Sequence, residues 1–287
     1  MDPGALRYAL TADEHDAFER VGYLIVRGAL RDDHVADLEA VIDTLHAARK
    51  LDSPRTYAGV MGRVQHKNSV GLDRAFVDLI DHPTTFPKVW GVLGWNIYVY
   101  NTHLMLTPPQ PDNGARGPTG WHQDLGRTTV DMPEVELLPR LSLKVGYFLT
   151  DLSRADMGNF WMIPGSHRRR SIGIKPGAAG MVPGAEPICA EAGDAMIFDR
   201  RLWHSGSPNY SDRTRKMLFY GYAYRWIRPY DGLPQGGSVL ATDDPIRRQL
   251  LEASGGHVRP YEVSDDEVPL RAWLAEHQPE AAAGHEY

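Results

Sequence analysis

The chain has 287 residues, of which 42% are hydrophobic and 24% charged, so it can bury a large core without disulfide or metal staples. Its formal net charge of −6 is opposite to the charge that binders of nucleic acids and anionic membranes usually carry. A single cysteine, Cys189, excludes an internal disulfide and a cysteine-based zinc cluster. The N-terminus lacks the basic and apolar regions of a signal peptide, and no stretch approaches the ~18 apolar residues of a membrane span. We therefore expect a cytoplasmic protein that binds neither membrane nor nucleic acid.

Two helices and a short strand are predicted for the first 50 residues. Thr11 and Glu14 form the pattern of a capping box, which opens a helix that ends near residue 20. The run Tyr23–Val26 is compact, apolar and typical of a strand. Apolar residues then recur at helical spacing over residues 32–49.

From residue 95 onward the pattern changes to short β-type runs. They are rich in Val, Ile and aromatic residues, are separated by turn residues, and cover 95–107, 141–150, 160–163, 195–198 and 216–226. Many short strands without intervening helices favour a closed or double-sheet β architecture. We expect one domain over 1–287, with helices and a strand in 1–50, a β core in about 95–226 and a C-terminal extension in 227–287.

A histidine and a carboxylate stand two residues apart in Trp-His-Gln-Asp, at His122 and Asp124. Positions i and i+2 of a strand share a face, so both side chains could reach one metal ion. His204, at the end of a later β-type run, is the natural third ligand. Two histidines and one carboxylate are the facial triad of non-haem Fe(II) oxygenases. An HxD triplet alone is common, however, and in most cases its histidine is an ordinary core or surface residue.

An arginine eleven residues beyond His204 strengthens this interpretation. Arg215 on a strand offers a planar, bidentate partner for a carboxylate, which a 2-keto acid that chelates iron would need at its far end. Arg213 competes for this role, because on one strand both side chains would face the same side.

The chain resembles the phytanoyl-CoA dioxygenase family of Fe(II)/2-oxoglutarate-dependent oxygenases. The family's WHQD-type element matches 121–124, and its LxHGS-type element matches 202–207, where this chain has Ser-Gly in place of Gly-Ser. Further elements follow in the family's order, namely FLTD at 148–151, GN at 158–159, IPGSH at 163–167 and GD at 193–194. The resemblance covers residues 11–226 and implies a double-stranded β-helix, which is a jelly-roll, cupin-like core that is mainly β with flanking helices.

The resemblance also implies roles for single residues. Fe(II) would be held by His122, Asp124 and His204, and 2-oxoglutarate by Arg215, with O2 as the second cosubstrate. Asn101 matches a position that often hydrogen-bonds the cosubstrate, although an amide at a strand edge explains it equally well. Lys144 replaces a small polar residue that often points inward, and it could reach 2-oxoglutarate, a substrate anion or solvent.

The implied activity is that of a dioxygenase that activates a C–H bond of a small organic substrate, most often by hydroxylation. Desaturation, epoxidation or ring formation are other outcomes, and we expect a role in specialised metabolism for a monomer or homodimer. Asp124 argues against halogenation, because halogenating relatives replace this carboxylate with a small residue.

Two other functional classes of protein are also consistent with the sequence. A cupin-like metal-binding protein without oxygenase chemistry would keep the barrel, but it would have no use for a carboxylate clamp at Arg215. A metal-dependent hydrolase or isomerase would need a general base, and no spare acid stands out beside His122 or His204.

Overall fold

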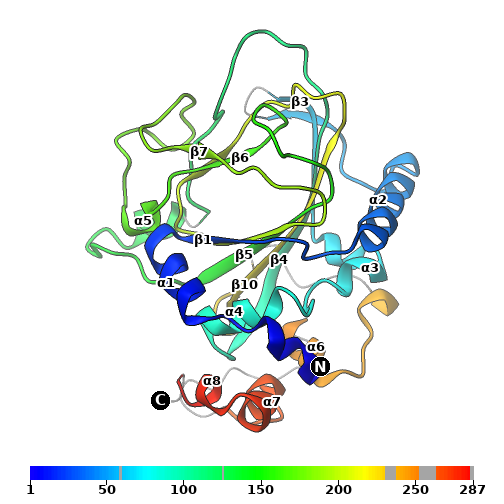
Figure 1. Cartoon of the computed structure of the whole chain (residues 1–287), viewed down its shortest axis with the longest axis vertical. Helices are drawn as coiled ribbons and strands as arrows, with labels where there is room; N and C mark the ends of the chain where they lie inside the picture. The colour runs from blue at the N-terminus through cyan, green and yellow to red at the C-terminus, as the bar shows by residue number, and fades with distance from the viewer. Residues whose placement is uncertain (58–59, 125, 230–236, 252–262, 285–287) are drawn as a thin grey trace.

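Two antiparallel sheets form the centre of the molecule. The computed structural model describes residues 1–57, 60–124, 126–229, 237–251 and 263–284. The larger sheet has the strand order β1-β8-β5-β10-β4-β3-β2, and the smaller has the order β7-β6-β9 (Figure 1). Their strands are β1 (Tyr23–Val26), β2 (Arg55–Tyr57), β3 (Val60–Lys67), β4 (Ile97–Thr107), β5 (Ser142–Phe148), β6 (Phe160–Met162), β7 (Glu186–Pro187), β8 (Ala195–Asp199), β9 (His204–Gly206) and β10 (Arg215–Tyr224). The predicted jelly-roll architecture, mainly β with flanking helices, is confirmed.

Strand alternation gives the larger sheet two different faces. On β10, Leu218 and Tyr220 point into the main hydrophobic core, whereas Met217 and Phe219 point into a second core that also contains β6 residues of the smaller sheet. Successive side chains of a strand point to opposite faces, so Arg215 shares the inner face with Met217. The alternation of side chains along β10 therefore places Arg215 in the space between the sheets.

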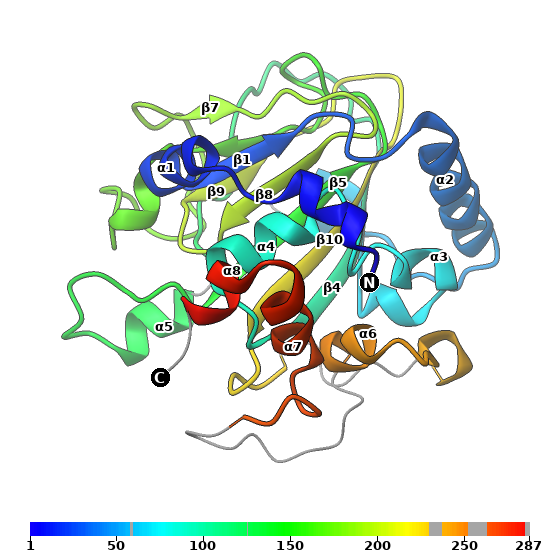
Figure 2. The same ribbon diagram turned by 60° about the horizontal axis from the view of Figure 1, so that its bottom comes forward.

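Helices cover the outer face of the larger sheet (Figure 2). The predicted capping box is present, with Thr11 accepting from the Glu14 amide and Glu14 accepting from the Thr11 amide. The α-helices are α1 (Ala12–Val21), α2 (Asp32–Ala47), α3 (Arg74–Val77), α4 (Phe86–Leu93), α5 (Gly126–Asp131), α6 (Pro245–Leu250), α7 (Pro269–His277) and α8 (Pro279–Ala283). Short 3-10 helices cover 3–8, 69–71, 166–168 and 237–240.

The larger sheet and the main hydrophobic core also include segments outside residues 95–226. β1 pairs with β8, and β3 pairs with β4, so both belong to the larger sheet. From the C-terminal extension, Leu270 and Leu274 of α7 lie in the main core, and Trp90 Nε1 of α4 donates to Gln278 at 3.1 Å. One hydrophobic core therefore contains residues from the N-terminal, β and C-terminal segments. Within the described residues, no helix is long and apolar enough to cross a membrane.

Core packing predicts a large difference between two leucine truncations. Leu218 is fully buried in the main core, whereas Leu137 is 52% exposed. Leu218→Ala should lower the free energy of unfolding by about 2–5 kcal/mol, because it removes buried methyl groups and leaves a cavity. Leu137→Ala, the matched control, should change it by less than about 0.5 kcal/mol. Chemical denaturation measures both, and equal effects would contradict this assignment of the core.

Candidate metal centre

Two backbone hydrogen bonds bring the predicted histidines together. His122 and His204 pair as an isolated antiparallel bridge, in which each amide donates to the other's carbonyl at 3.0 Å. Each Nδ1 lies 2.8–2.9 Å from a backbone carbonyl, that of Gly120 for His122 and that of Leu202 for His204. A carbonyl can only accept, so Nδ1 carries the proton and Nε2 keeps its lone pair. Both Nε2 atoms are therefore in the form that a metal ion requires.

Asp124 completes the predicted triad. Its Oδ1 lies 3.9 Å from Nε2 of His122 and 3.7 Å from Nε2 of His204. One ligand atom from each of the three residues lies within 4.8 Å of the others. The Asp124 amide donates to the carbonyl of Arg200 at 3.0 Å, so both HxD ligands are tied by their backbone to the segment around His204. The three predicted ligands therefore meet at one point between the sheets.

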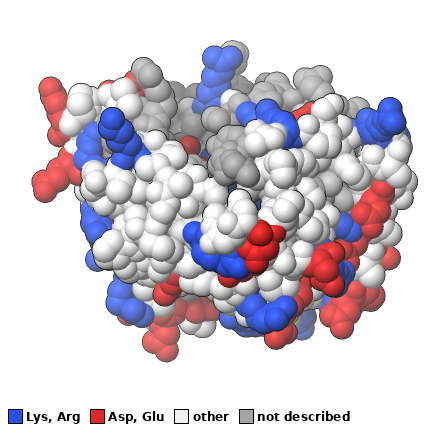
Figure 3. Space-filling view, turned by 90° about the horizontal axis from the view of Figure 1, so that it is seen from above, with Lys and Arg blue, Asp and Glu red and all other residues white. Residues whose placement is uncertain are grey.

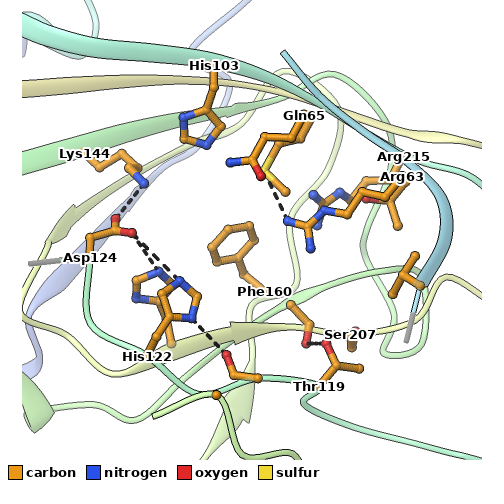
Figure 4. Close-up of a pocket in the computed structure, with 17 residues that line it drawn as sticks. Arg63, Gln65, His103, Thr119, His122, Asp124, Lys144, Phe160, Ser207 and Arg215 are labelled. Carbon is orange, nitrogen blue, oxygen red and sulfur yellow. Dashed lines mark hydrogen bonds and ion pairs between the residues drawn. The ribbon is translucent and has the colours of Figure 1, made fainter. Parts of the chain in front are cut away.

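The second oxygen of Asp124 faces two buried cations. Oδ2 lies 2.6 Å from Lys144 Nζ of β5 and 3.4 Å from Arg200 Nε. Burial raises the pKa of Asp124, but the charges of Lys144 and Arg200 outweigh burial and hold that pKa well below its usual value. The carboxylate is therefore ionised, with Oδ1 turned toward the imidazoles and Oδ2 held by Lys144 (Figure 4).

Burial keeps the imidazoles of His122 and His103 neutral. It lowers the pKa of His122 to about 4, with the nearby His204 as the next cause. His103 of β4 stacks on Phe219 with ring centroids 4.7 Å apart, and burial holds its pKa well below the usual value, helped by the charge of Lys144. At neutral pH neither ring carries a positive charge.

Arg215 is buried at the far end of the same pocket. Its Nη1 donates to the Gly158 carbonyl at 2.6 Å, and its buried Nε has no hydrogen-bond partner in the part of the chain that the structure describes. No carboxylate of the described residues lies within ion-pair distance of this guanidinium. Burial, followed by the charge of Arg63, lowers the pKa of Arg215 to about 9, so the group remains a cation at neutral pH. The predicted competitor, Arg213, is exposed in the turn before β10 and does not share a strand face with Arg215.

One pocket of about 340 Å³ joins the triad to Arg215. In Figure 4 His122, Asp124 and Lys144 lie at one end of the pocket. Arg215 and Arg63 lie side by side at the other end, and the Phe160 ring lies between the two groups. Its remaining lining comes mainly from β3, β4 and the segments flanking the histidines, namely Val60, Gln65, His103, Met105, Thr107, Thr119, Gly120, Gly177, Gly206 and Ser207.

Asn101 lies beside the triad but is not one of the residues lining the pocket. Its Oδ1 accepts from Arg200 Nη1 at 2.8 Å, and the Arg200 guanidinium lies 4.7 Å from the centre of the Tyr100 ring. Gly221 makes room for this contact, since a Cβ there would lie 1.9 Å from Oδ1 of Asn101. The described contacts place Asn101 in support of Arg200, and its predicted contact with a cosubstrate stays a prediction.

Sequence reasoning missed Arg200 and Arg63 as site residues. Arg200 follows β8 in the run Asp-Arg-Arg, which has no pattern that separates a site residue from a solvated charge. Arg63 and Gln65 do carry a signal, because they alternate with the buried Val64 on a strand that was not predicted. This alternation places both side chains on the pocket face of β3.

The arrangement of the strands matches that of enzymes with known structures. The epimerase SnoN from nogalamycin biosynthesis, solved with Fe3+ and alpha ketoglutarate, superposes with a TM-score of 0.59 at 19% identity, covering 93% of this chain and 98% of that chain. The carbocyclase SnoK from the same pathway gives a TM-score of 0.59 at 18% identity, with 81% and 91% covered. At these identities the likeness shows the fold, which is the jelly roll of 2-oxoglutarate-dependent oxygenases.

The family model for phytanoyl-CoA dioxygenase matches residues 18–217, so the chain belongs to that family. It is an Fe(II)/2-oxoglutarate-dependent dioxygenase, which rules against the cupin-like and hydrolase alternatives. An ectoine dioxygenase of Bordetella parapertussis is 24% identical over 252 residues, which cover 76% of this chain and 77% of the relative. An uncharacterized protein of Mycobacterium tuberculosis is 24% identical over 247 residues, with 82% and 84% covered.

Because Asp124 contacts Lys144, we expect substitutions of these two residues to have non-additive effects on the unfolding free energy of the metal-free protein. Asp124→Ala leaves two buried cations without their counter-charge and should cost about 3 kcal/mol of unfolding free energy. Adding Lys144→Met removes one of these cations and should recover part of that loss. Chemical denaturation of the two single variants and the double variant measures the coupling. Additive losses would show that the two side chains do not stabilise each other.

Proposed function

We propose that His122, Asp124 and His204 hold Fe(II), that Arg215 binds the far carboxylate of 2-oxoglutarate, and that the enzyme activates a C–H bond of a small organic substrate. One observation carries this proposal. Two imidazoles and one carboxylate offer ligand atoms within 4.8 Å of one another at one end of a pocket, and at its other end lies a buried arginine that has no carboxylate partner among the described residues.

The donor set fits Fe(II). Two neutral imidazoles and one carboxylate suit a divalent iron and leave coordination positions open for a chelating keto acid and O2. The tautomers of His122 and His204 are set by the carbonyls of Gly120 and Leu202, so ligation needs no proton rearrangement at either ring. Bound iron, with 2-oxoglutarate and O2, supplies the oxidising power, and the protein supplies positioning and exclusion of water.

Arg215 fits the carboxylate end of the cosubstrate. Among the described residues, the buried guanidinium of Arg215 has a neutral carbonyl and the Phe160 ring as partners, and it gains a charge-assisted, bidentate contact when a carboxylate arrives. Phe160, between Arg215 and the triad, offers an apolar surface for the methylene carbons that separate the two ends of the keto acid. The pocket is thus polar at both ends and apolar in the middle, as 2-oxoglutarate is.

The remaining lining favours a small organic substrate. It combines apolar side chains such as Met105 and Val60 with a few polar groups. Among the described lining residues Asp124 is the single carboxylate, and Lys144 occupies its second oxygen, so none is available as the general base of a hydrolase. Hydroxylation in specialised metabolism stays a prediction for this site.

The first experiment tests the ligands. We expect anaerobic addition of Fe(II) and then 2-oxoglutarate to metal-free protein to produce the weak visible charge-transfer band of a chelated keto acid. His122→Ala, Asp124→Ala and His204→Ala should each abolish the band, while far-UV circular dichroism shows that each variant is folded. A wild-type band in any of the three would remove that residue from the ligand set.

The second experiment tests whether Arg215 binds the far carboxylate of 2-oxoglutarate, and Arg213 serves as the matched control. Arg215→Ala should weaken binding of 2-oxoglutarate by about 2–4 kcal/mol, because one charge-assisted bidentate pair is lost. Arg213→Ala removes the same side chain two residues away, where it is exposed, and should leave binding unchanged. The band, titrated with 2-oxoglutarate, measures both affinities, and a larger loss in Arg213→Ala would reverse the assignment.

A further inference from the structure

Lys144 is a buried lysine near the middle of the larger sheet. It lies on β5 directly opposite Phe198 of β8 and Gly221 of β10. Its Nζ lies 5.7 Å from the centre of the Phe198 ring and 5.6 Å from the centre of the Phe219 ring. Aromatic rings attract a cation that lies over them, so these two contacts stabilise the ammonium group at this place in the pocket.

The ion pair with Lys144 engages one oxygen of Asp124 and leaves the other toward the imidazoles. Nζ lies 2.6 Å from Oδ2, whereas Oδ1 lies 3.7 Å from Nε2 of His204. In Figure 4 Lys144 and His122 lie on opposite sides of the carboxylate. A carboxylate can bind a metal ion through one oxygen or through both, so the ion pair determines which oxygen is available.

Arg200 offers the same oxygen a competing partner. Its Nε lies 3.4 Å from Oδ2 and makes no hydrogen bond within the described residues, while its Nη1 donates to Asn101 at 2.8 Å. Gly221 leaves the space for this side chain, since a Cβ there would lie 2.8 Å from Nη1 of Arg200. A guanidinium can bind a carboxylate through two parallel hydrogen bonds. Without Lys144, Asp124 is therefore free to turn toward Arg200 and away from the imidazoles.

Burial distinguishes this ion pair from the charged pairs of the outer surface. On the face shown in Figure 3, basic and acidic side chains are interspersed around a largely uncharged centre, where water and salt screen their charges. The side chains of Lys144 and Asp124 are 7% and 13% exposed. Their attraction is therefore weakly screened and can orient the carboxylate.

We propose that Lys144 is a positioning residue, which holds Oδ2 of Asp124 so that Oδ1 alone is presented to a divalent metal ion. The inference rests on the proposed function, in which Asp124 is a metal ligand. It assigns Lys144 to the metal centre in place of 2-oxoglutarate, a substrate anion or solvent, the three partners that the sequence left open. Keeping Oδ2 away from the metal also keeps a coordination position open for the chelating keto acid.

Charge and positioning predict opposite effects of Lys144 on metal affinity. An ammonium group repels a divalent cation, so removal of a charge that did nothing else would strengthen metal binding. Removal of a group that orients a metal ligand weakens binding, by about tenfold to a hundredfold. The sign of the change therefore separates a positioning residue from a charge that is merely nearby.

Co(II) tests the inference in the absence of 2-oxoglutarate and substrate. Calorimetry measures its affinity for metal-free protein, and its visible d–d absorption reports the ligands around it. We expect Lys144→Met to weaken Co(II) binding about tenfold or more and to change the visible spectrum. Lys144→Gln, a polar alternative if methionine prevents folding, should act in the same direction because it also lacks the charge. Lys144→Arg keeps a cation that can pair with Oδ2, so it should restore much of the affinity and the spectrum.

Lys88→Met is the matched control. Lys88 Nζ of α4 lies 2.7 Å from Oε2 of Glu14, and its side chain is 8% exposed, so this variant also breaks the ion pair of a buried lysine. Lys88 is not one of the residues lining the pocket. The variant should lower the free energy of unfolding and leave Co(II) affinity and spectrum unchanged. An equal loss of Co(II) affinity in Lys88→Met would reduce the effect of Lys144→Met to a general loss of stability and contradict the inference.

Three further results would overturn the inference. They are Co(II) binding that is unchanged or stronger in Lys144→Met, a wild-type Co(II) spectrum in that variant, and loss of 2-oxoglutarate affinity in that variant with both Co(II) properties intact. The last would assign Lys144 to the cosubstrate. Failure of the proposed function has a different signature, since wild-type protein would then bind no Co(II), or would bind it with a spectrum that His122→Ala and His204→Ala do not change.

Discussion

The site depends on one buried carboxylate that serves two sets of partners. Asp124 turns one oxygen toward His122 and His204 and the other toward Lys144 and Arg200. Burial by itself raises the pKa of Asp124, and the surrounding charges, those of Lys144 and Arg200 first, hold that pKa well below its usual value. The same cations would be unstable without it, so the metal centre and the charge balance of the interior are inseparable.

Strand alternation explains how the fold assembles this centre. Lys144 of β5 lies between Leu143 and Val145 of the main hydrophobic core, so its own side chain points to the inner face, and Arg215 of β10 shares that face with Met217, two residues further along the strand. The smaller sheet contributes His204, and the bridge between His122 and His204 closes the space between the layers. Each polar group is thus placed by the burial of its apolar neighbours, and a shift of one residue in register would remove it from the pocket.

The sequence by itself predicted the jelly-roll class, the three candidate metal ligands and a preference for Arg215 over Arg213, because these predictions follow from short motifs and strand-like runs that match the family's order. Only the tertiary structure shows that Arg215 is buried in the pocket and Arg213 is exposed, since the turn before β10 ends the strand alternation that would have aligned them. It also revealed Arg200 and Arg63, whose partners Asn101, Asp124 and Met105 lie on other segments of the chain. The physical reason is that burial and charge pairing depend on which segments pack together, and no local pattern encodes a contact between residues that are far apart in the chain.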